Sequence, residues 1–157
     1  SKGIEINKTA FNLKPQIDDI LKGFKAQLKV RELTLQNNIA ESLRLNADKE
    51  KIHQVLVNLI DNAIKFNKEK GFIKIDSEEE DGLIKVIVED SGMGIPPKDI
   101  PRIFERFYRV DKARSRELGG TGLGLSIVKH IIELHGGNAG LESTEGLGSK
   151  FWFTLPK

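Results

Sequence analysis

The sequence predicts a two-layer α/β sandwich, with three main helices on one face of a mixed, mostly antiparallel sheet. Two observations lead to this prediction. Apolar residues recur at helical spacing in three segments, and short apolar segments bounded by turn residues lie between them. Helices and strands that are each apolar on one side bury that side by packing as two layers. At 157 residues the chain has the size of one ordinary domain, covering residues 1–157.

The first part of the chain supplies a strand, a helix and two further strands. We expect the first strand over 4–9 and the helix near 13–30. Strands over 33–39 and 43–46 follow. The helix is predicted by apolar residues at helical spacing, namely Ile17, Ile20, Leu21, Phe24 and Leu28.

A second helix is expected from Asp48, a residue type that commonly caps helices, to Phe66. Its apolar residues form a complete stripe, consisting of Ile52, Val55, Leu56, Leu59, Ile60, Ala63 and Ile64. At about 100° per residue, Asn58, Asn62 and Lys65 fall within about 60° of each other and roughly 140° from the stripe's centre. Asparagine is a poor helix former, so an ordinary solvated face would favour other residues. We infer that the amide oxygens face a hard cation or its waters, with Lys65 near phosphate oxygens.

A hairpin follows, made of strands 71–79 and 83–90 with an acidic turn between them. The second strand is apolar, and a short helix is expected near 97–103. The chain closes with a helix behind a glycine-rich loop and with strands near 138–143 and 149–155.

The hairpin ends at Asp90, which is followed by Gly92, Gly94 and Ile95. A buried strand that ends in this pattern places a carboxylate on the floor of a pocket, and the glycines let the chain turn under a flat ligand. The carboxylate can accept a hydrogen bond from an exocyclic amine such as that of adenine. The simpler alternative is that Asp90 caps a tight turn.

Residues 117–125 form a glycine-dense loop that leads into an amphipathic helix. Glycines at a helix start let the backbone approach an anion, which the free N–H groups and the positive dipole end then bind. The loop lacks the Gly-Lys-Ser/Thr of a Walker P-loop and the dinucleotide fingerprint. A flexible loop capped by a helix is the simpler alternative. Eleven of the fifteen glycines lie between 92 and 148, however, and ordinary turn usage does not explain that clustering.

Four segments resemble the motif boxes of the ATP-binding catalytic domain of sensor histidine kinases, a superfamily shared with DNA gyrase, the heat-shock chaperone ATPases and the mismatch-repair ATPases. They are the asparagine box at 58–66, the first glycine box at 90–95, the phenylalanine box at 103–111 and the second glycine box at 120–125. Together they lie within residues 48–155 at the family's spacing. The resemblance implies the Bergerat-type ATP-binding fold.

The resemblance also implies roles for individual residues where they match. Asn62 would bind Mg²⁺ and Asn58 would lie beside the phosphates. Lys65 and Arg109 would contact the phosphate chain, and Asp90 would read adenine. We expect Asn58, Lys65 and Arg109 to be the catalytic group. The other expected nucleotide contacts are Phe66, Gly92, Gly94, Ile95, Tyr108, Gly120, Thr121, Gly122, Leu123, Gly124, Leu125 and Ser149.

Three of these assignments carry a qualification. Ser149 is expected to support Asp90 or a bridging water. Phe66 stands where the family frequently has Tyr, so a role that needs a phenolic hydroxyl is absent. Relatives that hydrolyse ATP carry a glutamate at the position of Asn58, and asparagine cannot take a proton from water. The chain is therefore expected to hold ATP for transfer rather than hydrolysis.

The function implied is binding of Mg-ATP and donation of its γ-phosphate to a histidine on a separate dimerisation domain, with a response regulator downstream. Two alternatives stay open: a nucleotide-gated docking module without transfer activity, and an anti-sigma-factor serine kinase of the same fold, which the full phenylalanine box disfavours. Residues 108–121 are polar and glycine-rich, and we expect them to form a mobile lid over the phosphates. Phe104 and Phe107 are expected to be core anchors.

Composition and the histidines narrow the remaining possibilities. The net charge of +2 and the pI of about 8.8 do not indicate nucleic-acid binding, and without cysteine no disulfide or thiolate metal site can form. His53, His130 and His135 are not followed by Glu or Asp, as a phosphoacceptor histidine usually is. We therefore expect a cytoplasmic catalytic domain separate from its phosphoacceptor, its sensor and any membrane anchor. The isolated domain should be a monomer and the full-length protein a homodimer.

Overall fold

A computed structural model of the chain describes residues 5–110 and 124–157. The elements that it contains are β1 (Thr9–Asn12), α1 (Leu13–Gly23), α2 (Lys25–Val30), β2 (Thr34–Asn37), β3 (Arg44–Ala47), α3 (Lys49–Lys65), β4 (Phe72–Glu80), β5 (Leu83–Asp90), the 3₁₀ helix η1 (Ile100–Arg102), α5 (Gly124–Leu134), β6 (Ala139–Thr144) and β7 (Gly148–Pro156). No helix in the described ranges is both long enough and apolar enough to cross a membrane.

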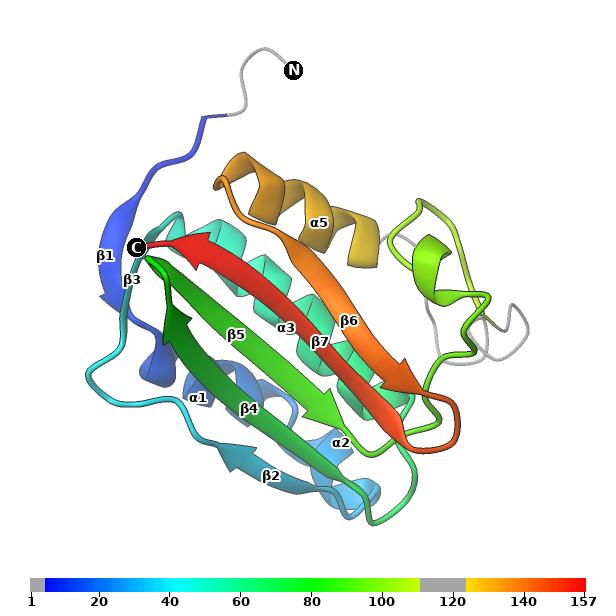
Figure 1. Ribbon diagram of the computed structural model, residues 1–157. Helices are drawn as coiled ribbons and strands as arrows, with labels where there is room; N and C mark the ends of the chain where they lie inside the picture. The colour runs from blue at the N-terminus through cyan, green and yellow to red at the C-terminus, as the bar shows by residue number, and fades with distance from the viewer. Residues whose placement is uncertain (1–4, 111–123) are drawn as a thin grey trace.

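The main sheet has five strands in the order β2-β4-β5-β7-β6. β2 pairs with β4 in parallel, and the other neighbours pair antiparallel. β1 and β3 form a separate antiparallel pair. Figure 1 shows α1, α3 and α5 on one face of the five-stranded sheet. The predicted two-layer sandwich with a mixed, mostly antiparallel sheet is therefore confirmed.

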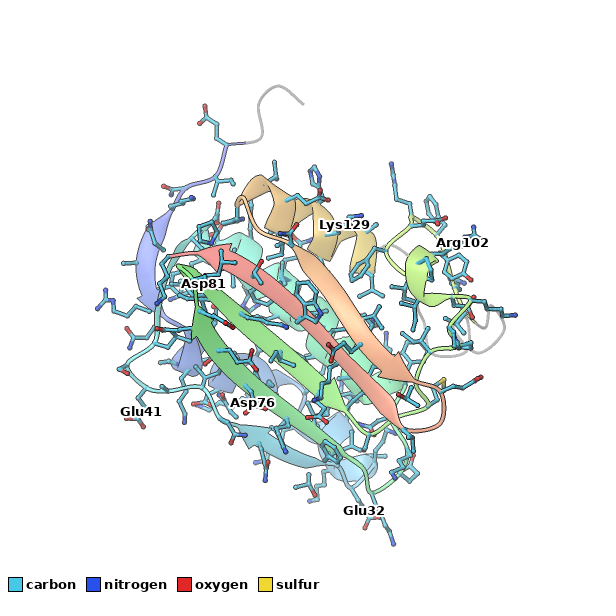
Figure 2. All side chains as sticks on the ribbon, in the orientation of Figure 1. Glu32, Glu41, Asp76, Asp81, Arg102 and Lys129 are labelled. Carbon is cyan, nitrogen blue, oxygen red and sulfur yellow. The ribbon has the colours of Figure 1, made fainter. Side chains whose placement is uncertain are left out.

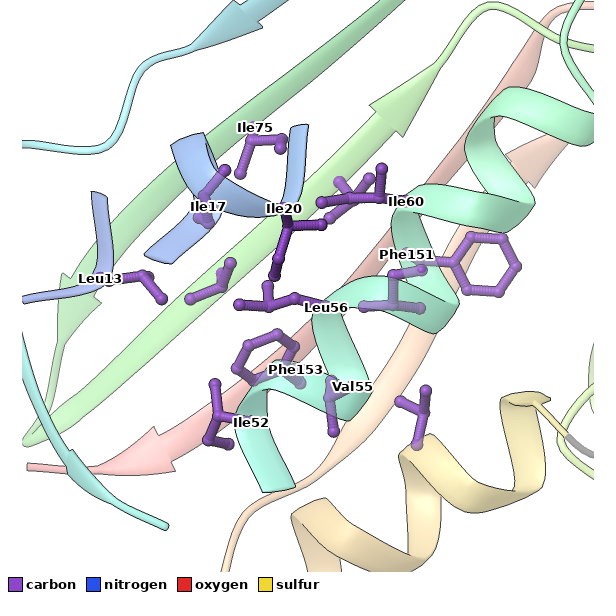
Figure 3. Packing of buried hydrophobic residues seen from close by; sticks show 14 of the residues in the cluster. Leu13, Ile17, Ile20, Ile52, Val55, Leu56, Ile60, Ile75, Phe151 and Phe153 are labelled. Atoms are coloured by element: carbon purple, nitrogen blue, oxygen red, sulfur yellow. The ribbon is translucent and has the colours of Figure 1, made fainter. Parts of the chain in front are cut away.

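The core lies between this sheet and the helices. Every residue of the predicted apolar stripe on α3 is buried. On β5 the buried side chains alternate with half-buried or exposed ones, because successive side chains of a strand point to opposite faces. Figure 3 shows side chains of α1, α3, β4 and β7 packed together, with Phe153 close to α3. Burial of each large aliphatic side chain contributes about 1.5–3 kcal/mol, so the stripe fixes α3 against the sheet.

The predictions for the first 30 residues were only partly correct. The first strand covers Thr9–Asn12 rather than 4–9, because these are the residues that find a partner, in β3. The predicted helix over 13–30 is broken into two. α1 ends at Gly23, and Phe24 donates its N–H back to Leu21 and Lys22. Glycine weakens helices, and the second piece, α2, buries no residue that could hold it in line with the first.

The region between β5 and α5 was predicted less well than the hairpin before it. The short helix expected near 97–103 is reduced to the three residues of η1. Most of the predicted lid at 108–121 lies outside the described residues. The same is true of Gly120, Thr121, Gly122 and Leu123 of the second glycine box. Gly124 and Leu125 of that box are the first two residues of α5.

Candidate functional site

The polar face of α3 lies against the start of α5. Asp48 caps α3 as predicted, since its Oδ1 accepts a hydrogen bond from Lys51 N at 3.3 Å. Asn58 and Asn62 are half-buried, so this face is not simply solvated. Asn58 Nδ2 donates to the carbonyl of Gly124, the first residue of α5, at 3.4 Å. The N–H groups of a helix's first turn have no intrahelical partner, so anion-binding groups lie beside Asn58.

Lys65, on the last turn of α3, is held by a carboxylate that the sequence analysis did not single out. Its Nζ lies 3.0 Å from Asp61 Oδ2, and the two side chains are 28% and 33% exposed. The signal for this ion pair was present, because opposite charges four residues apart meet on one helix face. The pair places the ammonium of Lys65 within one helical turn of Asn62.

Asp90, the last residue of β5, is buried, with an exposed fraction of 7%. Burial raises the pKa of its carboxyl to about 6, although the N–H groups of Gly92 and Ser149 lower it, and the charge of Glu89 adds to the rise. The Gly92 N–H donates to Asp90 Oδ1 at 2.8 Å. This hydrogen bond shows that Asp90 caps the turn, as the simpler alternative predicts. The same carboxylate is also buried at the end of the strand, as the binding-site interpretation predicts.

The turn after Asp90 packs directly on the end of α3. A Cβ on Gly92 would lie 2.1 Å from Phe66 O, and Met93 N donates to the same carbonyl at 3.1 Å. Gly94 has a φ of +69°, and a Cβ there would lie 2.1 Å from Thr144 O. The sequence pattern predicts that these glycines let the chain turn under a flat ligand. In the structure, close contacts between chain segments already require both of them.

Ser149 and Ile95 meet at a serine that the sequence analysis missed. Ser149 Oγ lies 2.8 Å from Ser143 Oγ, and the N–H of Ile95 donates to Ser143 Oγ at 2.8 Å. Ser143 therefore joins β6, β7 and the first glycine box. Nothing in the local sequence of Ser143 marked it. Ser149 acts on the Asp90 carboxyl through its backbone N–H.

The phenylalanine box places its two rings differently. The Phe104 ring packs edge-on against Phe151, with centroids 6.3 Å apart, and so anchors the segment to the core as predicted. The prediction for Phe107 was wrong, since this residue is 62% exposed. Its φ of +64° is a left-handed conformation, which takes the chain through a turn in which the side chain leaves the core. Arg106 lies over its ring, 5.8 Å from the centroid.

Tyr108 is anchored by a buried carboxylate that was also missed. Its hydroxyl donates to Asp99, which is 5% exposed, and this hydrogen bond raises the pKa of the Tyr108 phenol. The guanidinium of Arg102 stacks on the Tyr108 ring, 4.5 Å from its centroid. The neighbouring Arg109 is half-buried. The hydroxyl of Tyr108 is thus committed to Asp99.

The residues present fit a magnesium ion that takes most of its ligands from phosphate and water rather than from the protein. Among the described residues, no three His, Cys, Asp or Glu side chains are grouped so that they could hold a metal. Mg²⁺ usually takes one or two protein oxygens and completes its shell with phosphate and water. The half-buried amide of Asn62 can supply one such oxygen.

These groups lie at one end of the sheet. Figure 2 shows Arg102 near the start of α5, at the opposite end of the molecule from Asp81 in the β4–β5 turn. The acidic turn therefore takes no part in this arrangement. By the helical rise of 1.5 Å per residue, Asn58 and Phe66 are about 12 Å apart along α3. A ligand of that length could contact α5 at one end and the Asp90 turn at the other.

Comparison with known proteins assigns a family. Residues 47–157 match the family described as histidine kinase-, DNA gyrase B-, and HSP90-like ATPase. The sensor histidine kinase WalK of Bacillus subtilis is 41% identical over 99% of this chain. The chain spans 26% of the length of WalK.

Solved structures agree with that assignment. The catalytic domain of histidine kinase ThkA matches with a TM-score of 0.82 and 37% identity, over 96% of both chains. ThkA in complex with response regulator protein TrrA matches at 0.80 and 34%, over 97% of this chain and 42% of that chain. Full-length ShkA in complex with AMPPNP matches at 0.82 and 26%, over 98% of this chain and 32% of that chain. The chain belongs to the family of histidine kinase-, DNA gyrase B- and HSP90-like ATPases.

Proposed function

We propose that this chain binds Mg-ATP and donates the γ-phosphate to a histidine on a separate dimerisation domain. The observation that carries the proposal is the arrangement along α3. The helix has Asn58 against the start of α5 at one point, and the buried carboxylate of Asp90 packed next to its end. The region around Asn58 and the start of α5 suits phosphates, and the region around Asp90 suits a base.

The adenine end of the site is assigned to Asp90 and the glycine turn. A buried carboxylate accepts hydrogen bonds only, so it selects a base that presents an amine. Gly92, Gly94 and Ile95 shape the turn beside it. Ser149 holds the carboxylate from the adjacent strand.

The phosphate end is assigned to α3 and the start of α5. Lys65 and Arg109 supply positive charge, with Phe66 and Tyr108 beside them. The N–H groups at Gly124 and Leu125 add the partial charge of a helix N-terminus. Asn62 would hold Mg²⁺, which on binding neutralises phosphate charge and orients the oxygens. Gly120 and Thr121, the last two residues of the proposed lid at 108–121, would complete this end together with Gly122 and Leu123, which follow them directly.

Asn58 favours transfer over hydrolysis. Its amide donates to the Gly124 carbonyl, and an amide cannot remove a proton from water. Transfer of a phosphoryl group requires mainly positioning and charge stabilisation, with the attacking and leaving atoms in line. The attacking nitrogen would come from a histidine outside this chain.

Signalling partners follow from the same proposal. AMPPNP in the ShkA complex and TrrA in the ThkA complex support an ATP site and a response regulator downstream. The parent would be a cytoplasmic kinase or a membrane-anchored one that dimerises through its histidine domain. Residues 1–157 would be its catalytic domain and a monomer by themselves.

The direct test is transfer in a mixture of separate domains. The chain, Mg²⁺ and γ-labelled ATP are incubated with the histidine-containing dimerisation domain of WalK. Acid-labile label on that domain is the expected result. A dimerisation domain whose acceptor histidine is replaced by Gln serves as the control. Binding of ATP without any labelling would contradict the transfer function and leave a nucleotide-gated docking module.

A further inference from the structure

Arg31, just after α2, binds the end of α3 with its whole guanidinium, although it lies outside every motif box. Its side chain is 21% exposed. Nη1 donates to the carbonyls of Ile64 and, at 3.2 Å, of Lys65, and Nη2 donates to the carbonyl of Asn67. Nε lies 3.0 Å from Glu69 Oε1. Three of these contacts are made to backbone that positions the candidate site.

The arrangement suits arginine and no other side chain. The last carbonyls of a helix have no intrahelical partner, and a cation at that end interacts favourably with the helix dipole. A planar guanidinium reaches several carbonyls at once, which a lysine ammonium on its flexible stem does not. The carbonyl of Arg31 also accepts a hydrogen bond from Lys70 N at 3.0 Å. Backbone and side chain together hold the helix end and the turn after it.

A buried hydrogen-bond chain leads from the guanidinium to the turn that carries Asp90. Asn67, whose carbonyl accepts from the guanidinium, is 2% exposed. Its Oδ1 accepts from Ser91 Oγ at 3.0 Å, and its Nδ2 donates to Phe72 O at 3.0 Å. Ser91 is the residue after Asp90, and its Oγ also accepts from Phe72 N at 2.8 Å. A Cβ on Gly71 would lie 2.4 Å from Asn67 Oδ1, so glycine there keeps the network closed.

We propose that Arg31 is a positioning residue for nucleotide binding. It fixes the end of α3, where Lys65 lies, and through Asn67 and Ser91 it fixes the carboxylate of Asp90. This inference rests on the proposed ATP site. Arg31 itself does not touch the nucleotide. Its loss should therefore affect the phosphate end and the adenine end together.

Three variants test the proposal by calorimetric titration of ATP, at a temperature where circular dichroism shows each to be folded. Arg31→Gln should weaken binding by about tenfold or more, the factor that corresponds to ~1.4 kcal/mol. Arg31→Lys should fall between it and the wild type, because the charge stays while carbonyl contacts are lost. Glu69→Gln, the matched control, removes the exposed ion pair alone and should change affinity less than about twofold. A folded Arg31→Gln or Arg31→Lys with wild-type affinity would overturn the proposal.

A double variant of Arg31 and Ser91 distinguishes a positioning role of Arg31 from a general effect on stability. If Arg31 acts through the buried chain, Arg31→Lys and Ser91→Ala together should cost less ATP affinity than the sum of the two single losses. Additive losses would mean independent effects and would overturn the proposed route. The amide resonance of Gly92, which reports the bond to Asp90, should also shift in Arg31→Lys and stay in place in Glu69→Gln. That readout needs no nucleotide, so it decides the positioning role even if the wild type fails to bind ATP.

Discussion

Asp90 combines burial with a turn-capping hydrogen bond. Its carboxylate can accept more bonds than the turn supplies, which makes it suited to an amine on the ligand. GTP should bind worse than ATP, because guanine presents a carbonyl where adenine presents the amine, and the unmatched pair costs about 1–3 kcal/mol. Asp90→Asn should weaken ATP binding by a similar amount. Equal affinities for ATP and GTP in calorimetry would rule out this role.

The raised pKa of Asp90 gives a second prediction, on stability. The folded pKa of about 6 lies above the ordinary value of 3.8, so folding favours the protonated carboxyl. Ionisation therefore lowers the free energy of unfolding as the pH rises from about 4 to about 6, with no further change above. Asp90→Asn cannot ionise and should be more stable than the wild type at pH 7, by about 1–3 kcal/mol. Urea unfolding of both proteins at pH 4 and pH 7 checks this, and a difference independent of pH would contradict it.

Substitutions at Asn62 and Lys65 should have different effects on the magnesium dependence of ATP binding. Asn62→Ala should largely remove the dependence of ATP binding on Mg²⁺, because it deletes the proposed protein ligand. Lys65→Ala should weaken binding with or without the metal, and it also leaves Asp61 without its partner. ATP is titrated in Mg²⁺ and in chelator, with exposed Lys129→Ala as the control (Figure 2). A full magnesium effect in Asn62→Ala would place the metal ligand elsewhere.

Among elements, the contact between α3 and the β5 turn is the least tolerant of change. Gly92→Ala would force a methyl group into Phe66 O, so we expect a loss of about 1–3 kcal/mol in stability together with weaker ATP binding. Gly23→Ala is the matched control. Nothing lies within 4 Å of the place that a Cβ on residue 23 would occupy, and alanine favours helix, so this substitution should be neutral or stabilising by up to about 1 kcal/mol. Thermal unfolding measures both, and equal losses would contradict the account.

The elements that could be predicted from the sequence are those with local signals. α3 was predicted from a cap and a complete apolar stripe, and both are present in the structure. β5 was predicted from an apolar run between turn residues. β1 was misplaced because its position depends on pairing with β3, more than 30 residues away along the chain. The prediction for Phe107 was wrong because its backbone is left-handed and turns the side chain outward, and phenylalanine gives no sequence signal for that conformation.

At the scale of the whole molecule, the motif boxes predicted which segments meet but not what holds them. Asp90 was identified from the glycine pattern that follows it at the end of an apolar strand, and Asn58 because asparagine is a poor helix former. Arg31 and Ser143 were not, since each bonds to a segment distant in sequence. Asp99 was not identified either, because no local pattern encodes its bond to Tyr108, although the two are only nine residues apart. Short motifs therefore predict which residues carry the chemistry of the site, whereas the residues that hold them in position can be identified only from the fold.

The most direct test of the central claim is a crystal structure of the chain with Mg²⁺ and AMPPNP. The account predicts the adenine amine within hydrogen-bonding distance of the Asp90 carboxylate, about 2.7–3.2 Å. It also predicts the metal on Asn62 Oδ1 and the phosphates between Lys65 and the first turn of α5. A nucleotide bound with its base away from Asp90, or with its metal on other protein ligands, would contradict it.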